Sequence, residues 1–142
     1  MATTEEVRAG SPVHDRLQIS VVRQEPGHVT MSMPLTDDIR GYFEGSIHGG
    51  VLATFADIAC AFCLEGCYDF GREFTVTTDM HNRYFRQPQG GPLVAEATMV
   101  HRGRRVMSAE CSIADAANRI LVRSTATYMV IPTDGMVVAS SG

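Results

Sequence analysis

Residues 45–64 read GSIHGGVLATFADIACAFCL, and this stretch decides the fold. Apolar residues recur at positions 51, 52, 55, 59, 62 and 63, which is the spacing of one helical face. The opposite side carries Ala53, Ala56, Cys60 and Leu64, so the predicted helix is apolar nearly all round and is expected to be buried. Asp57 is the only fully charged residue of the stretch. An aspartate in a buried helix is costly unless it is paired, hydrogen-bonded or protonated, which makes Asp57 the first candidate functional residue.

The composition is that of an ordinary globular domain. The chain has 142 residues, of which 44% are hydrophobic and 20% charged, enough for one domain with one substantial core. A net charge of −4 argues against a strongly basic nucleic-acid-binding protein. The apolar helix is too short and too rich in Ala, Gly and Thr for a membrane span, and no secretory signal is visible. We therefore expect a cytoplasmic protein with neither a membrane nor a nucleic acid as partner.

Four cysteines occur, at positions 60, 63, 67 and 111, and the first three share one helical face. A metal or cluster site would need a fourth ligand nearby, and none is visible in the sequence. Reduced cysteine otherwise behaves as a small core hydrophobe, and disulfides are not expected in the cytosol. We therefore expect buried free thiols and no metal.

The rest of the chain has the period-two alternation of strands. A hairpin is predicted from residues 17–21 and 29–33, followed by a loop over 35–47 and then the helix, which is expected to end near Gly66. Four more strands are predicted at 74–85, 93–100, 105–113 and 120–131, and their short connections imply antiparallel pairing. The expected organisation is a flexible tail over 1–14, one domain over 15–132 and a second tail over 133–142.

These elements predict an α+β fold in which a curved antiparallel sheet of about six strands wraps around one long central helix. A helix that is apolar all round needs more cover than one sheet face provides. A second copy of the chain could supply that cover, so we expect a homo-oligomer, either a dimer or a dimer of dimers.

The Gly49-Gly50 turn at the helix start allows two interpretations. Free N–H groups at a helix start, close to a glycine backbone, suit an oxyanion hole, but the glycines could equally be a sterically required turn. Asp57 could likewise be a functional or a structural acid. Eight residues of helix separate Asp57 from Gly49 by about 12 Å, so one helix cannot bring both to the same carbonyl, whereas two antiparallel helices at a dimer interface could.

Four segments carry a family resemblance: HGGVLATFAD (48–57), VTTDM (76–80), YFRQP (84–88) and LVRSTATY (121–128). In this order and strand context they resemble the hotdog-fold thioesterases, in particular the PaaI-like acyl-CoA thioesterases. The resemblance covers roughly residues 15–132.

The resemblance implies hydrolysis of acyl-CoA thioesters at a dimer interface, with coenzyme A entering only as part of the substrate and no separate cofactor. Asp57 matches the family's nucleophile or general base, and the Gly49 N–H matches the group that polarises the thioester carbonyl. Thr77 matches a strand hydroxyl that helps to place the water or the acid. Gly50 and Thr78, their neighbours, are the accompanying candidates for substrate binding.

The chain departs from the family pattern at Tyr42, where many members carry an asparagine six positions before the histidine. Tyr42 is therefore a candidate substrate contact with a single hydroxyl in place of an amide. His48 could be a general acid or base, although its position favours bracing the turn. Arg102, Arg104 and Arg105 cluster on a predicted turn and could contact the phosphates of CoA, or simply form a solvated hairpin tip.

Two other functions remain open. Hotdog-fold dehydratases or hydratases pair an acid with a histidine in one site for proton transfer, which the spacing here does not favour. A non-catalytic acyl-CoA-binding protein of the same fold is the second alternative, and Tyr42 is the feature that supports it. The acyl group, aliphatic or aromatic, is not specified by the sequence.

Overall fold

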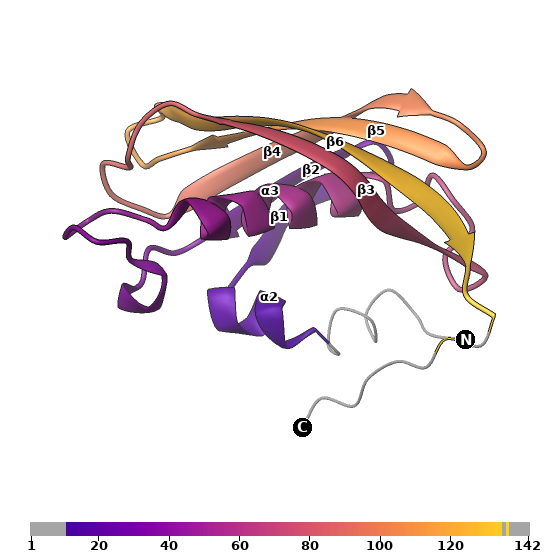
Figure 1. Ribbon diagram of the computed structural model, residues 1–142, viewed down its shortest axis with the longest axis horizontal. Coiled ribbons are helices and arrows are strands. Elements are labelled where there is room, and N and C mark those ends of the chain that lie inside the picture. Colours follow the sequence, from indigo (N-terminus) through magenta and orange to yellow (C-terminus); the bar gives the residue numbers. More distant parts are fainter. Residues whose placement is uncertain (1–10, 135, 137–142) are drawn as a thin grey trace.

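The computed structural model describes residues 11–134 and 136 as a single curved sheet packed on one long helix (Figure 1). Two short helical segments and hairpin connections complete the domain. In chain order the elements are α2 (Pro12–Leu17), β1 (Ser20–Glu25), β2 (His28–Met33), η1 (Asp37–Ile39), α3 (Gly49–Cys63), β3 (Glu73–Tyr84), β4 (Leu93–Arg102), β5 (Val106–Ala114) and β6 (Ile120–Pro132).

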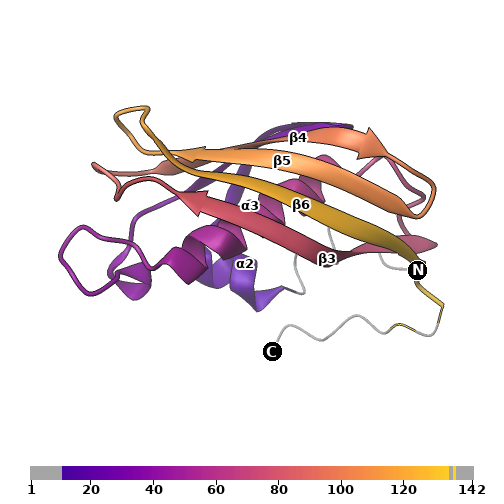
Figure 2. The same ribbon diagram turned by 45° about the horizontal axis from the view of Figure 1, so that its top comes forward.

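The sheet has six strands in the order β1-β2-β4-β5-β6-β3, and every neighbouring pair is antiparallel. The sheet curves over α3, and α2 lies on the side of α3 away from the sheet (Figures 1 and 2). Strand β3 forms one edge and pairs along its length with β6. The strand that follows α3 in the chain, β3, is therefore an edge strand of the sheet.

The core lies between the sheet and α3. Every second residue is buried along β2 and over the first half of β4, from Leu93 to Ala97, in agreement with the predicted alternation. Four alanines on the buried face, Ala95, Ala97, Ala109 and Ala126, leave room for the helix to pack closely against the strands. The helix contributes Leu52, Phe55 and Ala59, all at most 2% exposed. Each large apolar side chain buried in this way contributes about 1.5–3 kcal/mol.

Helix α3 ends at Cys63, three residues before the predicted end at Gly66. The hairpin β1–β2 takes up the carbonyls that end the helix: Gly27 N–H donates to Cys63 O at 2.8 Å, and Gln24 Nε2 donates to Phe62 O at 2.9 Å. Gly66 lies beyond the helix with φ +85°, in a turn that packs against the hairpin. Local turn bonds from Leu64 N–H to Ala61 O and from Glu65 N–H to Phe62 O therefore act together with the hairpin at the end of the helix.

The N-terminal part differs from the prediction as well. Residues Pro12–Leu17 form helix α2, and the first strand begins at Ser20 rather than at 17. Pro12 starts the helix, and Gln18 ends it in the left-handed region with φ 55°. Most of the two expected tails, residues 1–10, 135 and 137–142, lies outside the described residues, so the domain boundaries stay predictions.

One face of α3 is less buried than expected. Val51, Ala53, Thr54 and Asp57 are partly exposed in the single chain, so the prediction of a fully buried helix holds only on the side that faces the sheet. Asp57 itself is half-buried because the sheet covers only that side. Within residues 11–134 and 136, no helix is both long and apolar enough to cross a membrane.

Candidate active site

The carboxylate of Asp57 is held by two hydroxyl groups from neighbouring strands. Thr77 Oγ1 on β3 donates to Asp57 Oδ1 at 2.7 Å, and the Tyr128 hydroxyl on β6 lies 2.7 Å from the same oxygen. Thr77 and Tyr128 are direct cross-strand partners, so the sheet register sets both hydroxyls side by side, facing the middle of α3. The arrangement fixes the orientation of the carboxylate relative to the sheet.

Tyr128 is the buried member of this group, with only 1% of its surface exposed. Its hydroxyl also lies 2.8 Å from the backbone carbonyl of Asp57, so its single hydrogen is shared between two acceptors on one residue. Burial first, then the neighbouring Cys60 and Asp57, raises the pKa of Tyr128 well above its ordinary value of 10.0. Tyr128 therefore stays protonated at neutral pH and acts as a donor to Asp57.

Only one oxygen of the Asp57 carboxylate is engaged in this way. Oδ1 takes both hydroxyl contacts, while no hydrogen bond to Oδ2 occurs within the described part of the chain. Asp57 lies on the partly exposed face of α3, so Oδ2 is the carboxylate oxygen that the described residues leave without a hydrogen bond. The site thus has a positioned acceptor on a fixed carboxylate.

The His48-Gly49-Gly50 turn forms the start of α3. His48 is the N-cap residue, and its Nδ1 accepts a hydrogen bond from Gly50 N–H at 3.1 Å. The expectation that His48 braces the turn is therefore confirmed, and the Gly50 N–H is occupied. The Gly49 N–H makes no hydrogen bond within residues 11–134 and 136, and it is the first amide of the helix. Gly49 is the amide of this turn that remains available to a carbonyl oxygen.

Tyr84 adds an aromatic wall to this turn. A Cβ atom placed on Gly49 would lie 3.8 Å from the Tyr84 ring, so the glycine backbone faces that ring closely. A surface hollow of about 610 Å³ adjoins the turn, and the loop over 41–49 lines it together with Gln87 and Pro88. Tyr42 stands in this loop and is 98% exposed.

The turn and the carboxylate lie apart in a single chain. Gly49 and Asp57 both belong to one uninterrupted helix, so eight residues at 1.5 Å each separate them by about 12 Å along its axis. Of the predicted catalytic residues, Asp57 and Thr77 come together, and His48 joins Gly49 in a second group. In one chain the predicted catalytic residues therefore form two separate groups, one around Asp57 and one around Gly49.

The remaining predicted contacts lie away from these two groups. Thr78 Oγ1 donates to the Thr127 carbonyl at 3.2 Å, so its hydroxyl links β3 to β6. Arg102, Arg104 and Arg105 are exposed around the β4–β5 connection. Their main chain continues into the sheet, where Val130 N–H donates to Arg105 O at 2.7 Å. Within the described residues no hydrogen bond or ion pair joins these arginines to Asp57, Thr77 or the His48-Gly49-Gly50 turn, so their role stays a prediction.

Sequence reasoning assigned no role to Tyr128 and Tyr84. For Tyr128 the sequence did hold a signal: a tyrosine at an inward position of a strand is buried, and a buried phenol needs a hydrogen-bond partner. The four cysteines are buried and free, as expected of core residues. Among the described residues, no group of three or more His, Cys, Asp or Glu side chains could hold a metal ion.

The fold has close counterparts among solved structures. A variant of a Staphylococcus aureus thioesterase superposes with a TM-score of 0.82 at 23% identity, covering 86% of this chain and 100% of that chain. A variant of the phenylacetic acid degradation protein PaaI of Thermus thermophilus gives 0.74 at 22% identity, covering 84% of this chain and 98% of that chain. The predicted hotdog fold, an antiparallel sheet around one long helix, is confirmed.

Sequence comparisons agree with the fold. A "putative esterase" of Halobacterium salinarum is 29% identical over 104 residues, which span 72% of this chain and 69% of that protein. The model of the family described as the thioesterase superfamily matches residues 44–122, a range that contains the His48-Gly49-Gly50 turn, Asp57 and Thr77. Because that match spans more than half of the chain, the protein belongs to the thioesterase superfamily.

Proposed function

We propose that the protein is an acyl-CoA thioesterase that hydrolyses an acyl- or aryl-CoA to the free acid and CoA. The observation that carries this proposal is the Asp57 carboxylate, which Thr77 and Tyr128 hold at Oδ1 while Oδ2 accepts no hydrogen bond from the described residues. Membership in the thioesterase superfamily supports the same reaction class. We expect no cofactor beyond the coenzyme A of the substrate.

Two routes are compatible with this geometry. In the general-base route, Asp57 Oδ2 takes a proton from water, the hydroxide adds to the thioester carbonyl, and the C–S bond breaks to release CoA thiolate, which is then protonated. In the nucleophilic route, Oδ2 itself attacks the carbonyl, CoA thiolate leaves, and water hydrolyses the resulting mixed anhydride. Both routes place negative charge on the carbonyl oxygen, where one backbone N–H donor can contribute about 3–4 kcal/mol.

The complete site would combine two half-sites from different subunits: the Asp57 group of one subunit and the Gly49 turn of the other. The separation of about 12 Å along α3 prevents Asp57 from sharing a carbonyl with Gly49 of its own chain. Two features support pairing with a second copy: the partly exposed face of α3, and the edge strand β3, whose outer side pairs with no strand of the described residues. In this arrangement Asp57 acts on a carbonyl held by Gly49 of the partner subunit.

The substrate contacts remain part of the proposal. Tyr42 offers a phenol hydroxyl beside the hollow at the helix start, where it would contact the acyl group or the attacking water. The exposed arginines 102, 104 and 105 would bind the phosphates of CoA through charge-assisted hydrogen bonds. Gly50 and Thr78 would contribute through the shape of the turn and strand rather than through free donors.

A dehydratase or hydratase is disfavoured by the partners of Asp57. The contacts of its carboxylate within the described residues are two hydroxyls, and the nearest histidine along the helix, His48, is engaged at Nδ1 with Gly50. A non-catalytic acyl-CoA-binding protein is the second candidate, and Tyr42 in place of the family's asparagine favours it.

A hydrolysis screen separates these functions. The protein is incubated with acyl-CoA thioesters of increasing chain length and with aryl-CoA thioesters, and free thiol is measured with a thiol-reactive dye. We expect thiol release from at least one class and its loss in Asp57→Asn. Binding of CoA thioesters without thiol release would support the binding protein, and conversion of an enoyl-CoA without thiol release would support the hydratase.

A further inference from the structure

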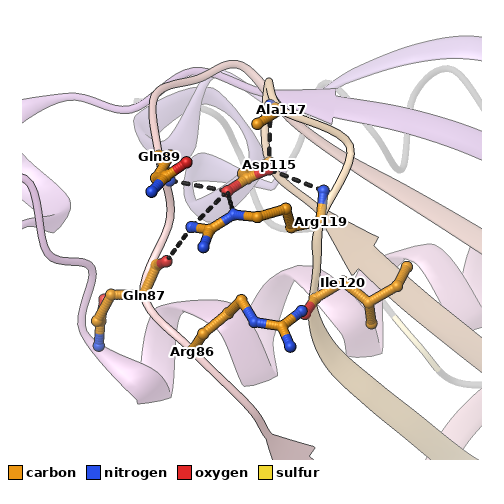
Figure 3. A network of polar contacts seen from close by, with 7 residues as sticks. All are labelled: Arg86, Gln87, Gln89, Asp115, Ala117, Arg119 and Ile120. Carbon is orange, nitrogen blue, oxygen red and sulfur yellow. Dashed lines mark hydrogen bonds and ion pairs between the residues drawn. The ribbon is translucent and has the colours of Figure 1, made fainter.

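A buried carboxylate anchors the connection between β3 and β4, the segment 85–92. Asp115, at the β5–β6 turn, is only 4% exposed. Its oxygens accept hydrogen bonds from three backbone N–H groups, those of Gln89 (2.8 Å), Ala117 (3.0 Å) and Arg119 (2.9 Å), as Figure 3 shows. The segment 85–92 is therefore tied to a turn that lies beside it in space and about 25 residues away in sequence.

Arg119 extends this network to Gln87. Its Nε donates to Asp115 Oδ2 at 3.1 Å, and a terminal nitrogen donates to the Gln87 carbonyl at 3.0 Å. On the other side, an Arg86 terminal nitrogen donates to Ile120 O at 2.8 Å. The main chain of Gln87 faces Arg119, while its side chain points away from the network (Figure 3). The main chain of Gln87 is thus held in place, and its side-chain amide is left to contact another part of the chain.

The Gln87 side chain reaches the start of α3. Its Oε1 accepts a hydrogen bond from Ile47 N–H at 2.9 Å, and Ile47 is only 2% exposed. The next amide, His48 N–H, donates to Ile39 O at 3.1 Å. Two successive peptide groups before Gly49 are therefore held by residues distant in sequence, and the first of them is held by Gln87.

We propose that Gln87 is a positioning residue for the Gly49 N–H, fixing the turn through Ile47 while the Asp115–Arg119 pair fixes Gln87. This inference rests on the proposed function, in which the Gly49 N–H binds the thioester carbonyl. An oxyanion donor is effective only when its direction is set before the reaction, and small misplacements are costly. Gln87 does not contact substrate; it acts on the backbone that presents Gly49.

The test compares three variants. Gln87→Ala removes the acceptor, Gln87→Glu keeps an oxygen acceptor on a side chain of the same length, and Gln89→Ala is the matched control in the same segment. Gln89 contacts Asp115 through its backbone N–H, which alanine retains. Steady-state thioester hydrolysis gives kcat and KM, and amide hydrogen exchange reports the Ile47 N–H directly.

We expect Gln87→Ala to lower kcat by about 10- to 100-fold with KM changed less than about threefold, and Gln87→Glu and Gln89→Ala to stay near the parent. Exchange of the Ile47 amide should accelerate in Gln87→Ala alone. Parent-like kcat and exchange in Gln87→Ala would overturn the proposal, and so would exchange that rises across the whole chain. If the parent hydrolysed no thioester, the proposed function would fail, and the Ile47 exchange would still decide whether Gln87 holds the turn.

Discussion

The Tyr128 hydroxyl lies 2.7 Å from Asp57 Oδ1 and 2.8 Å from the Asp57 carbonyl oxygen, so one phenol on β6 contacts both the side chain and the main chain of one residue on α3. A helix turn and a sheet face are thereby joined at the proposed catalytic carboxylate. The contact positions Asp57 without occupying Oδ2.

Tyr128→Phe tests this contact. The ring keeps its place in the core, but Asp57 loses one donor, so we expect kcat to fall about tenfold and the free energy of unfolding to fall by about 1 kcal/mol. Thiol-release kinetics and urea unfolding measure the two effects. Tyr68→Phe, beyond the C-terminal end of α3, is the matched control. An unchanged kcat in Tyr128→Phe would show that Thr77 alone suffices to hold the carboxylate.

Asp57→Asn tests the carboxylate itself. The amide retains the shape but can neither take a proton nor attack a carbonyl, so kcat should fall by about a hundredfold or more. The variant should fold and assemble like the parent, with equal or higher stability, because a half-buried charge is removed. Asp79→Asn, on exposed strand β3, serves as the control. Near-parent hydrolysis would refute the assignment, and Glu44 or Glu65 would then be the acids to test. Failure to fold would identify Asp57 as structural.

The arginines of the β4–β5 connection provide a test of CoA binding. If Arg102, Arg104 and Arg105 bind the CoA phosphates, replacing them with alanine should raise KM for acyl-CoA with little change in kcat. A higher salt concentration should likewise raise the KM of the parent for acyl-CoA, because salt screens exposed charges. An unchanged KM would leave the cluster as a solvated hairpin tip.

The assembly is tested by light scattering at micromolar concentration. We expect a dimer or a dimer of dimers, because one face of α3 stays partly exposed and edge strand β3 pairs with no further strand among the described residues. Catalysis should also require assembly, since the two half-sites lie about 12 Å apart on one helix. A species of only 15.4 kDa would exclude the shared site.

Asp115 predicts a pH dependence of stability. Burial opposes its ionisation, but hydrogen bonds from Gln89 and Arg119 outweigh that effect and lower its pKa from 3.8 to about 2. A depressed folded-state pKa means that the stabilisation is fully present above the unfolded value and is lost as the pH falls through the folded value. The parent should therefore lose this contribution between about pH 4 and pH 2.

Thermal unfolding of Asp115→Asn checks this expectation. The variant should be less stable than the parent at pH 7, and the difference should shrink as the pH falls towards 2. Asp79→Asn, at an exposed position of β3, is the control and should follow the parent closely at every pH. A difference that stays constant between pH 7 and pH 2 would show that the charge of Asp115 is not what stabilises the turn.

The local sequence determined most of the elements, with helix α2 as the exception. The helical spacing from Val51 to Cys63 and the alternation in β2 to β6 depend only on which residues are apolar and how far apart they stand, so both could be predicted without the fold. The His48 cap is similarly local, because a side chain two residues from Gly50 can reach its N–H. The eight-residue spacing of Gly49 and Asp57 followed from the helix alone.

Tertiary structure decided what surrounds these residues. The Tyr128 contact with Asp57 spans 71 residues of sequence, and the Gln87 contact with Ile47 spans 40. Such contacts depend on strand order and register, which period-two alternation does not specify, because any neighbouring strand would satisfy the same pattern. At the end of α3, Gln24 and Gly27 of the distant hairpin likewise bind the carbonyls of Phe62 and Cys63. The sequence by itself determined which residue carries the charge, and packing decided which hydroxyls hold it.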